Sequence, residues 1–166
     1  FNEEERLVST LQRLKTYLES QPYRSRILLV DDGSTDRTLA VAAEAGLGDR
    51  LRVVRHEVNR GKGAAVRTGM RESQGEYALF TDADLSTPIE EVEKFWPRVE
   101  EGFDVAIGSR GLPDSQIEVH QGFPREAMGR IFNVLVRYLV LPGIFDTQCG
   151  FKMFSRKAAD TIFAEA

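Results

Sequence analysis

The chain has 166 residues and a formal net charge of -4, with 42% hydrophobic and 29% charged residues. This length and composition fit one globular domain that can bury its own core, and they exclude a disordered chain. One cysteine and two histidines exclude a disulfide framework and a zinc site built from these residues. The mildly acidic balance argues against a nucleic-acid partner, because nucleic-acid binders need a basic surface.

Charge is unevenly distributed along the sequence. Residues 110–157 carry seven Lys and Arg against four Asp and Glu, a local balance of +3 in a chain whose total is -4. The remainder is therefore more acidic than the total indicates. A basic segment of this kind suits an anionic partner.

Predicted strands and helices alternate along the chain. The strands are short apolar runs, typical of parallel sheets buried on both faces, and the helices carry apolar residues at helical spacing. In chain order we expect a helix at 3–19, a strand at 27–30, a helix at 35–45, a strand at 51–54, a helix at 64–73, a strand at 77–81, a helix from 87 that bends or stops near 96, a strand at 103–108, a loop at 111–122, a helix at 123–141, a strand at 151–154 and a last helix capped by Ser155. This alternation predicts an α/β fold with a mostly parallel sheet and helices on both of its faces.

The first predicted helix begins close to the start of the chain. Asn2 and Glu5 have the spacing of a capping box at its N-terminus. A doubly wound sheet has a strand before its first helix. We therefore expect residues 1–166 to form a single domain that lacks its first strand, truncated at its N-terminus and also at its C-terminus.

Asp82 and Asp84 directly follow the predicted strand at 77–81. Ligands of open α/β sheets bind at the carboxyl ends of the strands. Two carboxylates separated by one small residue can reach a single divalent cation, and Mg²⁺ and Mn²⁺ prefer oxygen ligands. The alternative is that both aspartates only cap the turn and the next helix. The apolar strand before them and the strong helix start after them favour the metal site.

Two more polar segments follow the strands at 27–30 and 51–54. Asp31 and Asp32 begin an Asp-Asp-Gly-Ser turn, in which one aspartate can hold the turn while the other binds a base or ribose. The Asn59–Gly63 segment is rich in glycine but does not have the spacing of a Walker A motif. Its glycines favour close packing of helix and strand, and Lys62 is a candidate ligand of a diphosphate or base.

The predicted helix at 123–141 is apolar except for one polar stripe. Glu126, Arg130, Asn133 and Arg137 recur along that stripe at spacings of four, three and four residues. One interpretation is a core helix with a single solvated side. The alternative is an interfacial helix with its apolar side in lipid and its arginines at the headgroups.

Three residues that often carry chemistry show no such pattern here. We interpret His56 and His120 as surface or structural residues. Cys149 has no histidine near it in the sequence, so it is not a candidate nucleophile.

Taken together, these segments resemble the family-2 glycosyltransferases of the GT-A fold over nearly the whole chain. Their nucleotide-binding and metal motifs are similar to Phe1–Glu3, Val30–Asp36, Asn59–Gly63 and Thr81–Leu85. Two further segments, Gly108–Arg110 and Asp146–Lys152, resemble the polyprenyl-phosphate branch of the family, and within it the dolichyl-phosphate β-glucosyltransferases. The resemblance implies a single glycosyltransferase catalytic domain.

The resemblance also implies roles for single residues. Those expected to bind the nucleotide sugar are Phe1, Glu3, Asp31, Asp32, Lys62 and Asp82. Asp82 and Asp84 would hold Mg²⁺ or Mn²⁺ on the diphosphate and so take part in catalysis. The acceptor phosphate would meet Arg110, Arg125 and Lys152, and the loop with Asp146 and Gln148 is a further candidate for the acceptor site. Ser86 stands where mannosyl-transferring relatives usually carry Gln, which favours glucose.

The implied reaction moves glucose from UDP-glucose to a polyprenyl phosphate, dolichyl or undecaprenyl, with inversion. It would occur at the cytoplasmic face of a membrane that the helix at 123–141 contacts, the plasma membrane in a prokaryote or the endoplasmic reticulum in a eukaryote. Alternatives within the family use a sugar-hydroxyl acceptor in polysaccharide or cell-envelope synthesis, or GDP-mannose as the donor. The processive Q-x-x-R-W motif is absent. More remote alternatives are a haloacid-dehalogenase-type phosphatase, because Asp82–Ser86 is similar to D-x-D-x-T/S, and a non-enzymatic nucleotide-binding module.

Overall fold

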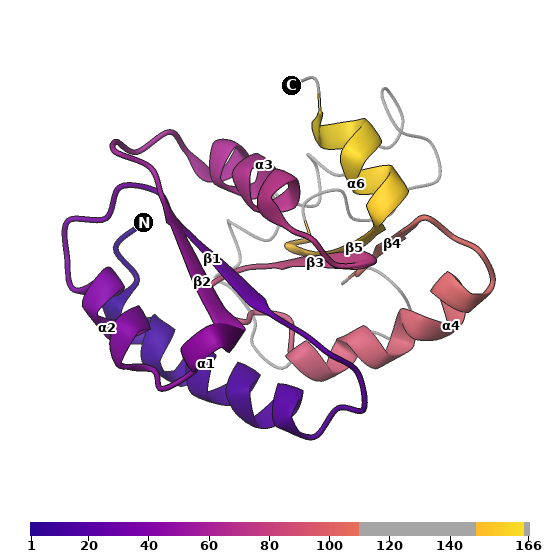
Figure 1. Cartoon of the computed structure of the whole chain (residues 1–166), viewed down its shortest axis with the longest axis horizontal. Helices are drawn as coiled ribbons and strands as arrows, with labels where there is room; N and C mark the ends of the chain where they lie inside the picture. The colour runs from indigo at the N-terminus through magenta and orange to yellow at the C-terminus, as the bar shows by residue number, and fades with distance from the viewer. Residues whose placement is uncertain (110–148, 165–166) are drawn as a thin grey trace, which may run out of the picture.

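The computed structural model describes residues 1–109 and 149–164 (Figure 1). The predicted loop at 111–122 and the predicted helix at 123–141 lie outside this part of the chain. Within the described ranges, no helix is both long and apolar enough to cross a membrane.

The predicted alternation of strands and helices is confirmed. The elements are α1 (Glu4–Glu19), β1 (Ile27–Asp31), α2 (Thr38–Glu44), the 3-10 helix η1 (Gly48–Arg50), β2 (Leu51–Arg55), α3 (Lys62–Glu72), β3 (Tyr77–Thr81), the 3-10 helix η2 (Ile89–Lys94), α4 (Trp96–Glu100), β4 (Val105–Ile107), β5 (Phe151–Ser155) and α6 (Arg156–Phe163). Most bounds lie within three residues of those expected from periodicity, because the apolar runs and glycine breaks that define them are local features.

The strands form two sheets. β1 pairs with β2 in parallel, with Ile27 opposite Leu51. In the second sheet, β5 lies between β3 and β4 and runs antiparallel to both, so that β3 and β4 point the same way. The expected α/β class is confirmed. The pairing of strands is mixed, because β5 is antiparallel to its neighbours whereas β1 and β2 are parallel. No described strand joins β1 to β3, and truncation of the domain stays a prediction.

Helices cover both faces of the strands. In Figure 1, α3 and α6 lie above the strands, and α1, α2 and α4 lie below them. Side chains of β5 alternate between the two faces: Phe151 and Met153 join the core cluster that also contains Leu14 and Val92, whereas Phe154 packs in the cluster of α3 and α6. β5 is therefore buried on both sides, which explains its continuous apolar character.

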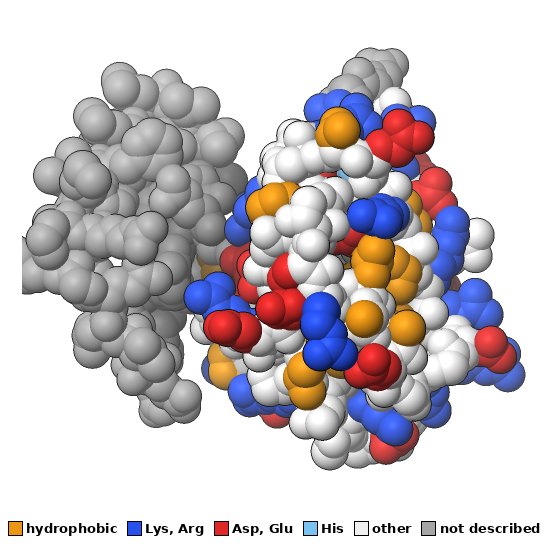
Figure 2. All heavy atoms as spheres, turned by 90° about the vertical axis from the view of Figure 1, so that its left-hand side faces the viewer, with side chains coloured by type: hydrophobic (Ala, Val, Ile, Leu, Met, Phe, Trp, Pro, Cys, Tyr) orange, Lys and Arg blue, Asp and Glu red, His pale blue; other side chains and the backbone are white. Residues whose placement is uncertain are grey.

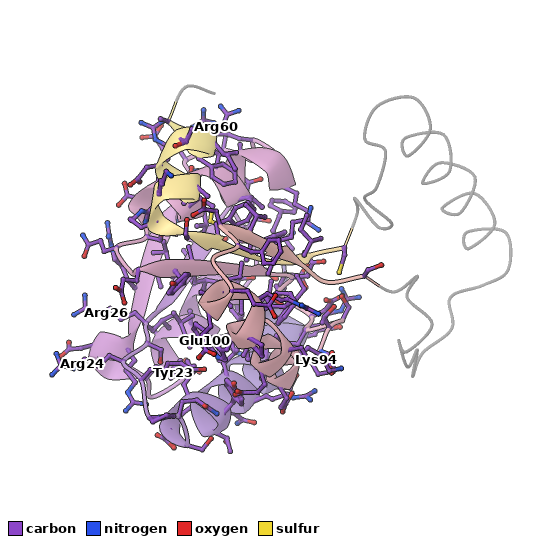
Figure 3. The ribbon with its side chains drawn as sticks, turned by 90° about the vertical axis from the view of Figure 1, so that its right-hand side faces the viewer. Tyr23, Arg24, Arg26, Arg60, Lys94 and Glu100 are labelled. Atoms are coloured by element: carbon purple, nitrogen blue, oxygen red, sulfur yellow. The ribbon has the colours of Figure 1, made fainter. Side chains whose placement is uncertain are left out.

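The carboxyl ends of β1 and β2 lie at one end of the molecule. Arg60 follows β2, and Tyr23, Arg24 and Arg26 precede β1; Figure 3 shows Arg60 at the end opposite to the other three. Loops that leave β1 and β2 are therefore separated from those that enter β1. The loops that follow β1 and β2, which contain residues expected to bind ligands, therefore lie at the same edge of the sheet.

The start of α1 corrects the predicted capping box. Glu3 is the N-cap residue, and its own side chain makes no capping hydrogen bond. Asn2 instead has a φ of 54°, and its Oδ1 accepts a hydrogen bond from the backbone N–H of Thr35 at 3.0 Å. The backbone N–H of Asn2 donates to Ser34 Oγ at 2.9 Å. A tertiary contact therefore replaces the local cap.

The segment after β3 also differs in part from the prediction. The helix expected from residue 87 is the 3-10 helix η2, whose N-cap residue is Pro88 and which has no side-chain cap. The expected break near Trp96 is confirmed, because η2 ends at Lys94 and α4 begins at Trp96. Pro97 lies in the first turn of α4, where its missing N–H leaves no helical hydrogen bond unmade.

The predicted cap of the last helix is confirmed and gives a test of local stability. Ser155 Oγ accepts a hydrogen bond from the backbone N–H of Ala158 at 3.1 Å and donates one to Asp104 Oδ1 at 2.6 Å. We expect Ser155→Ala to lower the free energy of unfolding by about 1 kcal/mol, because an N-cap is lost. Urea denaturation measures this change, and Ser155→Thr should retain most of the stability. An unchanged midpoint in the alanine variant would contradict the assigned cap.

Candidate functional site

Acidic side chains follow both β1 and β3, and each strand end has one ion pair, Arg55–Asp31 and Lys62–Asp82. Asp31 is the last residue of β1, and β3 ends at Thr81, directly before the Asp-Ala-Asp segment. The glycine-rich loop after β2 leads into α3 beside them. We call the following residues the carboxyl-edge cluster: Asp31, Asp32, Lys62, Asp82 and Asp84.

Lys62 and Asp82 are in direct contact within the carboxyl-edge cluster. Lys62 Nζ lies 2.7 Å from Asp82 Oδ1 and 5.6 Å from the centroid of the Phe80 ring. The Lys62 side chain is 66% exposed and that of Asp82 is 26% exposed. Solvent screens so exposed a pair, so the contact adds little stability and can be exchanged for contacts with an anionic ligand. The prediction that both residues serve one site gains a geometric basis.

Gly150 lies directly against the other oxygen of Asp82. A Cβ atom on Gly150 would lie 2.0 Å from Asp82 Oδ2, well inside any tolerable contact. The backbone before β5 can therefore lie this close to Asp82 because glycine has no side chain. The Asp82 carboxylate is held between this backbone and the Lys62 ammonium.

Asp84 presents an exposed carboxylate at the same edge. Its Oδ1 accepts a hydrogen bond from the backbone N–H of Ser86 at 3.0 Å. Leu85 adopts a φ of 45° and is buried, so its side chain anchors the turn while Asp84 points outward. Asp84 therefore holds its turn while its carboxylate is still accessible, and its role as a metal ligand stays a prediction.

Thr10 of α1 contacts the turn that contains Asp82 and Asp84. Its buried hydroxyl donates a hydrogen bond to the backbone carbonyl of Ala83 at 2.6 Å. Thr10 lies among the buried leucines of α1, and an apolar residue there would leave the carbonyl without this donor. The helix thus positions the segment between the two aspartates.

Asp31 holds the turn that follows β1. Its fully buried side chain accepts from the backbone N–H of Ser34 at 3.2 Å, and Arg55 Nε lies 3.3 Å from Oδ2. Gly33 has a φ of 76°, and a Cβ there would lie 2.8 Å from the backbone nitrogen of Asn59. The turn and the loop after β2 are therefore in backbone contact, and only glycine fits at their junction.

Asp32 links that turn to the start of α3. Its carboxylate accepts hydrogen bonds from the backbone N–H groups of Arg60 at 3.0 Å and Gly61 at 2.8 Å, and His56 Nδ1 lies 2.6 Å from Oδ1. Burial alone would raise the pKa of Asp32, but the hydrogen bonds from His56, Arg60 and Gly61 outweigh burial and hold the pKa below its ordinary value. The carboxylate is therefore charged and bonded within the protein, and its expected contact with a nucleotide stays a prediction.

The N-terminal residues lie beside the same turn. The backbone N–H of Glu3 donates to Thr38 Oγ1 at 2.9 Å, and the Glu3 carboxylate lies 3.6 Å from Arg6. Phe1 is 52% exposed and is available for contact with a ligand. Figure 2 shows this side of the molecule, where acidic and basic side chains are interspersed.

Residues predicted for the acceptor site are only partly described. Lys152 lies on β5 opposite Phe80 of β3, and the Lys62 ammonium lies over that same Phe80 ring. The residues outside the described ranges are Arg110, Arg125, Asp146 and Gln148. Their roles, and that of the helix at 123–141, stay predictions.

Three residues support the site through contacts that the sequence did not predict. His56 follows β2 at the carboxyl edge, and that position is the signal that would have assigned it to the site. Thr10 stands in a leucine stripe, where a lone polar residue marks a tertiary hydrogen bond. In the sequence, Gly150 stands out only as part of the segment Asp146–Lys152 that resembles the family. Its contact with Asp82 could not be predicted, because it depends on the pairing of β3 with β5. The interpretation of His56 as structural agrees with its burial.

The donor atoms at the edge suit a hard divalent cation. Within residues 1–109 and 149–164, no group of three His, Cys, Asp or Glu could hold a metal. Mg²⁺ commonly takes only one or two carboxylates and fills its other positions with water and substrate phosphates. The carboxylates of Asp82 and Asp84 fit this pattern, and their role as metal ligands stays a prediction.

Substitution of Gly150 tests the close approach to Asp82. We expect Gly150→Ala to lower the free energy of unfolding by about 1–3 kcal/mol, because the added methyl must displace the carboxylate or the backbone. Thermal or urea denaturation measures the change. Gly63→Ala is the matched control, since a Cβ at Gly63 meets nothing within 4 Å. Equal stability of the two variants would contradict the packing described.

The lowered pKa of Asp32 predicts a pH dependence of stability. The charged carboxylate is favoured in the folded state, so its contribution is complete above the unfolded pKa of about 4 and is lost as the pH falls through the lower folded pKa. We expect Asp32→Asn to unfold more easily at pH 7 and to show a smaller loss of stability between pH 5 and pH 3, about 1 kcal/mol less. Urea denaturation across this range measures it. Exposed Asp49→Asn should follow the parent, and a parent-like profile for Asp32→Asn would refute the assignment.

Known proteins resemble this chain in sequence and in fold. Dolichyl-phosphate beta-glucosyltransferase of Homo sapiens is 36% identical, with 99% of this chain and 55% of that protein aligned. The Saccharomyces cerevisiae protein of the same name is 34% identical, over 98% of this chain and 54% of that protein. This chain thus spans about half the length of these relatives.

A solved structure shares the fold. Mannosyl-3-phosphoglycerate synthase from Rubrobacter xylanophilus superposes with a TM-score of 0.62 at 19% identity, covering 94% of this chain and 51% of that one. This likeness confirms the expected GT-A type of fold. The sequence profile described as Glycosyl transferase family 2 matches residues 1–163. With a match of this extent, the chain belongs to glycosyl transferase family 2.

Proposed function

We propose that this chain transfers glucose from UDP-glucose to a polyprenyl phosphate, with release of UDP and inversion at the anomeric carbon. Membership of the family supports glycosyl transfer and argues against the phosphatase alternative. The names of the two relatives, which specify β-glucosyl transfer to dolichyl phosphate, support this sugar and this class of acceptor.

The observation that carries the proposal is the Lys62–Asp82 contact, because the exposed Asp84 lies only two positions along the chain from Asp82. A donor diphosphate brings negative charge to this edge. The Lys62 ammonium can turn from Asp82 to a phosphate oxygen, because the contact is solvent-exposed and contributes little stability. Its release leaves the Asp82 carboxylate available as a ligand beside that of Asp84.

Asp82 and Asp84 are the residues proposed to hold Mg²⁺ or Mn²⁺. When bound, a divalent cation acts as a Lewis acid that stabilises the charge developing on the departing diphosphate. Thr10 and Gly150 contribute indirectly, because they fix the turn and the carboxylate that such a ligand set requires. Lys62 would orient the donor phosphates.

The proposed acceptor makes a general base unnecessary. A phosphate monoester is already anionic near neutral pH, so one of its oxygens can attack the anomeric carbon without giving up a proton. The new C–O bond forms as the bond to UDP breaks, and UDP leaves with the electron pair. A single displacement inverts the anomeric carbon. Positioning of the acceptor anion needs cations, and the proposed ones are Lys152 with Arg110 and Arg125.

The lipid acceptor implies work at a membrane surface. We propose the cytoplasmic face, where nucleotide sugars and the acceptor phosphate would meet. The helix expected at 123–141, with its apolar sides and arginine stripe, is the proposed contact with lipid.

The proposal is tested with the full-length protein, UDP-glucose, a polyprenyl phosphate in detergent and Mg²⁺ or Mn²⁺. Chromatography of the lipid product should show polyprenyl-phosphate glucose, and chelation of the metal should abolish it. We expect Asp84→Asn to reduce turnover roughly a hundredfold. The variant loses one proposed ligand of the cation that would stabilise the negative charge on the departing diphosphate. Asp49→Asn, remote from the cluster, should match the parent.

Other outcomes would reject particular parts of the proposal. Parent-like turnover by Asp84→Asn would reject the metal assignment. Faster consumption of GDP-mannose than of UDP-glucose would reject the sugar. Transfer to a sugar hydroxyl, with none to the polyprenyl phosphate, would reject the acceptor.

A further inference from the structure

His56 is a buried, titratable residue that the proposed reaction does not use. It lies directly after β2, with 8% of its surface exposed. Both ring nitrogens have partners: Nδ1 lies 2.6 Å from Asp32 Oδ1, and Nε2 lies 2.9 Å from Thr68 Oγ1. A buried ring with both nitrogens bonded to different elements is held in one orientation.

The direction of these two hydrogen bonds follows from the chemistry of the partners. The Asp32 carboxylate can only accept, so Nδ1 carries a proton and donates it. In the neutral ring Nε2 then accepts from the Thr68 hydroxyl. Asp32, His56 and Thr68 form a chain of contacts that we call the His56 clamp.

The His56 clamp ends on the loop that begins α3. Besides the ring, Asp32 bonds the backbone N–H groups of Arg60 and Gly61. Gly61 is the N-cap residue of α3, with a φ of 89°, and the next residue is Lys62. The orientation of the Asp32 carboxylate therefore determines where α3 starts and where the Lys62 side chain leaves the backbone.

The clamp also holds α3 at a second point. Thr68 lies in the middle of α3, and its neighbour Gly69 packs closely on β1, where a Cβ would lie 3.3 Å from Val30 Cγ2. One ring thus connects the end of β2 both to the start and to the middle of this helix. A helix held at two points cannot rotate without breaking one of the contacts.

We propose that His56 is a positioning residue of the donor site: through Asp32 it fixes the start of α3 and places the Lys62 ammonium beside Asp82. The consequence for catalysis rests on the proposed function, whereas the geometric consequence does not. An apolar residue of similar size would fill the space of the ring but leave a buried carboxylate without one of its donors.

A double-mutant cycle separates positioning from general stabilisation. In the full-length protein we expect His56→Leu to lower kcat/KM for UDP-glucose roughly tenfold, mainly through a higher KM, because a hydrogen bond to a charged group is lost. Lys62→Ala should lower it as well. If His56 acts through Lys62, the double variant is no worse than Lys62→Ala alone, since the two losses share one cause.

One conservative variant and one control variant are measured beside the cycle. His56→Asn places an amide N–H near the position of Nδ1 and should recover most of the activity. Leu47→Ala, which removes a buried side chain of a different core cluster, should lower stability with the donor KM unchanged. Strictly additive losses for His56→Leu and Lys62→Ala, or a Leu47→Ala effect equal to that of His56→Leu, would overturn the proposal.

Hydrogen exchange tests the clamp without any substrate. We expect the amides of Arg60 and Gly61 to exchange at least tenfold faster in His56→Leu, with smaller increases in His56→Asn and Thr68→Val, because their acceptor loses its fixed orientation. Mass spectrometry of peptides spanning 57–63 measures this. Unchanged exchange in all three variants overturns the clamp. Absence of glucosyl transfer by the parent would reject the proposed function alone, and the exchange result would still decide the clamp.

Discussion

The arrangement of the site depends on the hydrogen bonds that the buried, charged carboxylate of Asp32 accepts. Removal of a carboxylate from water is costly unless hydrogen bonds replace its hydration. Here the donors are His56 and the backbone N–H groups of Arg60 and Gly61, all in the segment that joins β2 to α3, whereas Asp32 directly follows β1. The end of β1, the end of β2 and the start of α3 must therefore meet at one point. Lys62 and its contact with Asp82 follow from that meeting.

Two glycines allow this edge to close. Gly33 lets the turn after β1 touch the backbone of the loop after β2, and Gly150 lets the segment before β5 touch the Asp82 carboxylate. At Gly33 a methyl group would overlap with backbone atoms, and at Gly150 it would overlap with the Asp82 carboxylate. The site thus consists of loops in backbone contact, supported from α1 by the Thr10 hydroxyl. Such contacts position carboxylates more rigidly than long side chains can, and the proposed binding of phosphates and a cation depends on that rigidity.

Sequence patterns predicted most of the fold and the position of two carboxylates directly after a strand. The apolar runs, the glycine breaks and the Ser155 cap are local, so they survive in any tertiary setting that buries them. Asp82 and Asp84 were predicted because they follow a strand, and strand ends collect ligands. The predictions failed where a tertiary partner displaced a local one: Asn2 bonds Ser34 and Thr35 in place of capping α1.

The sequence by itself determined the order of strands and helices, the α/β class and the identity of the carboxylates at the strand ends, because each depends on neighbours within a few residues. Only the tertiary structure decided that β5 runs against β3 and β4, that Gly150 lies on Asp82, and that His56 holds Asp32. These contacts join residues more than twenty positions apart. Their formation depends on the packing of whole elements, and no local spacing of residues encodes it.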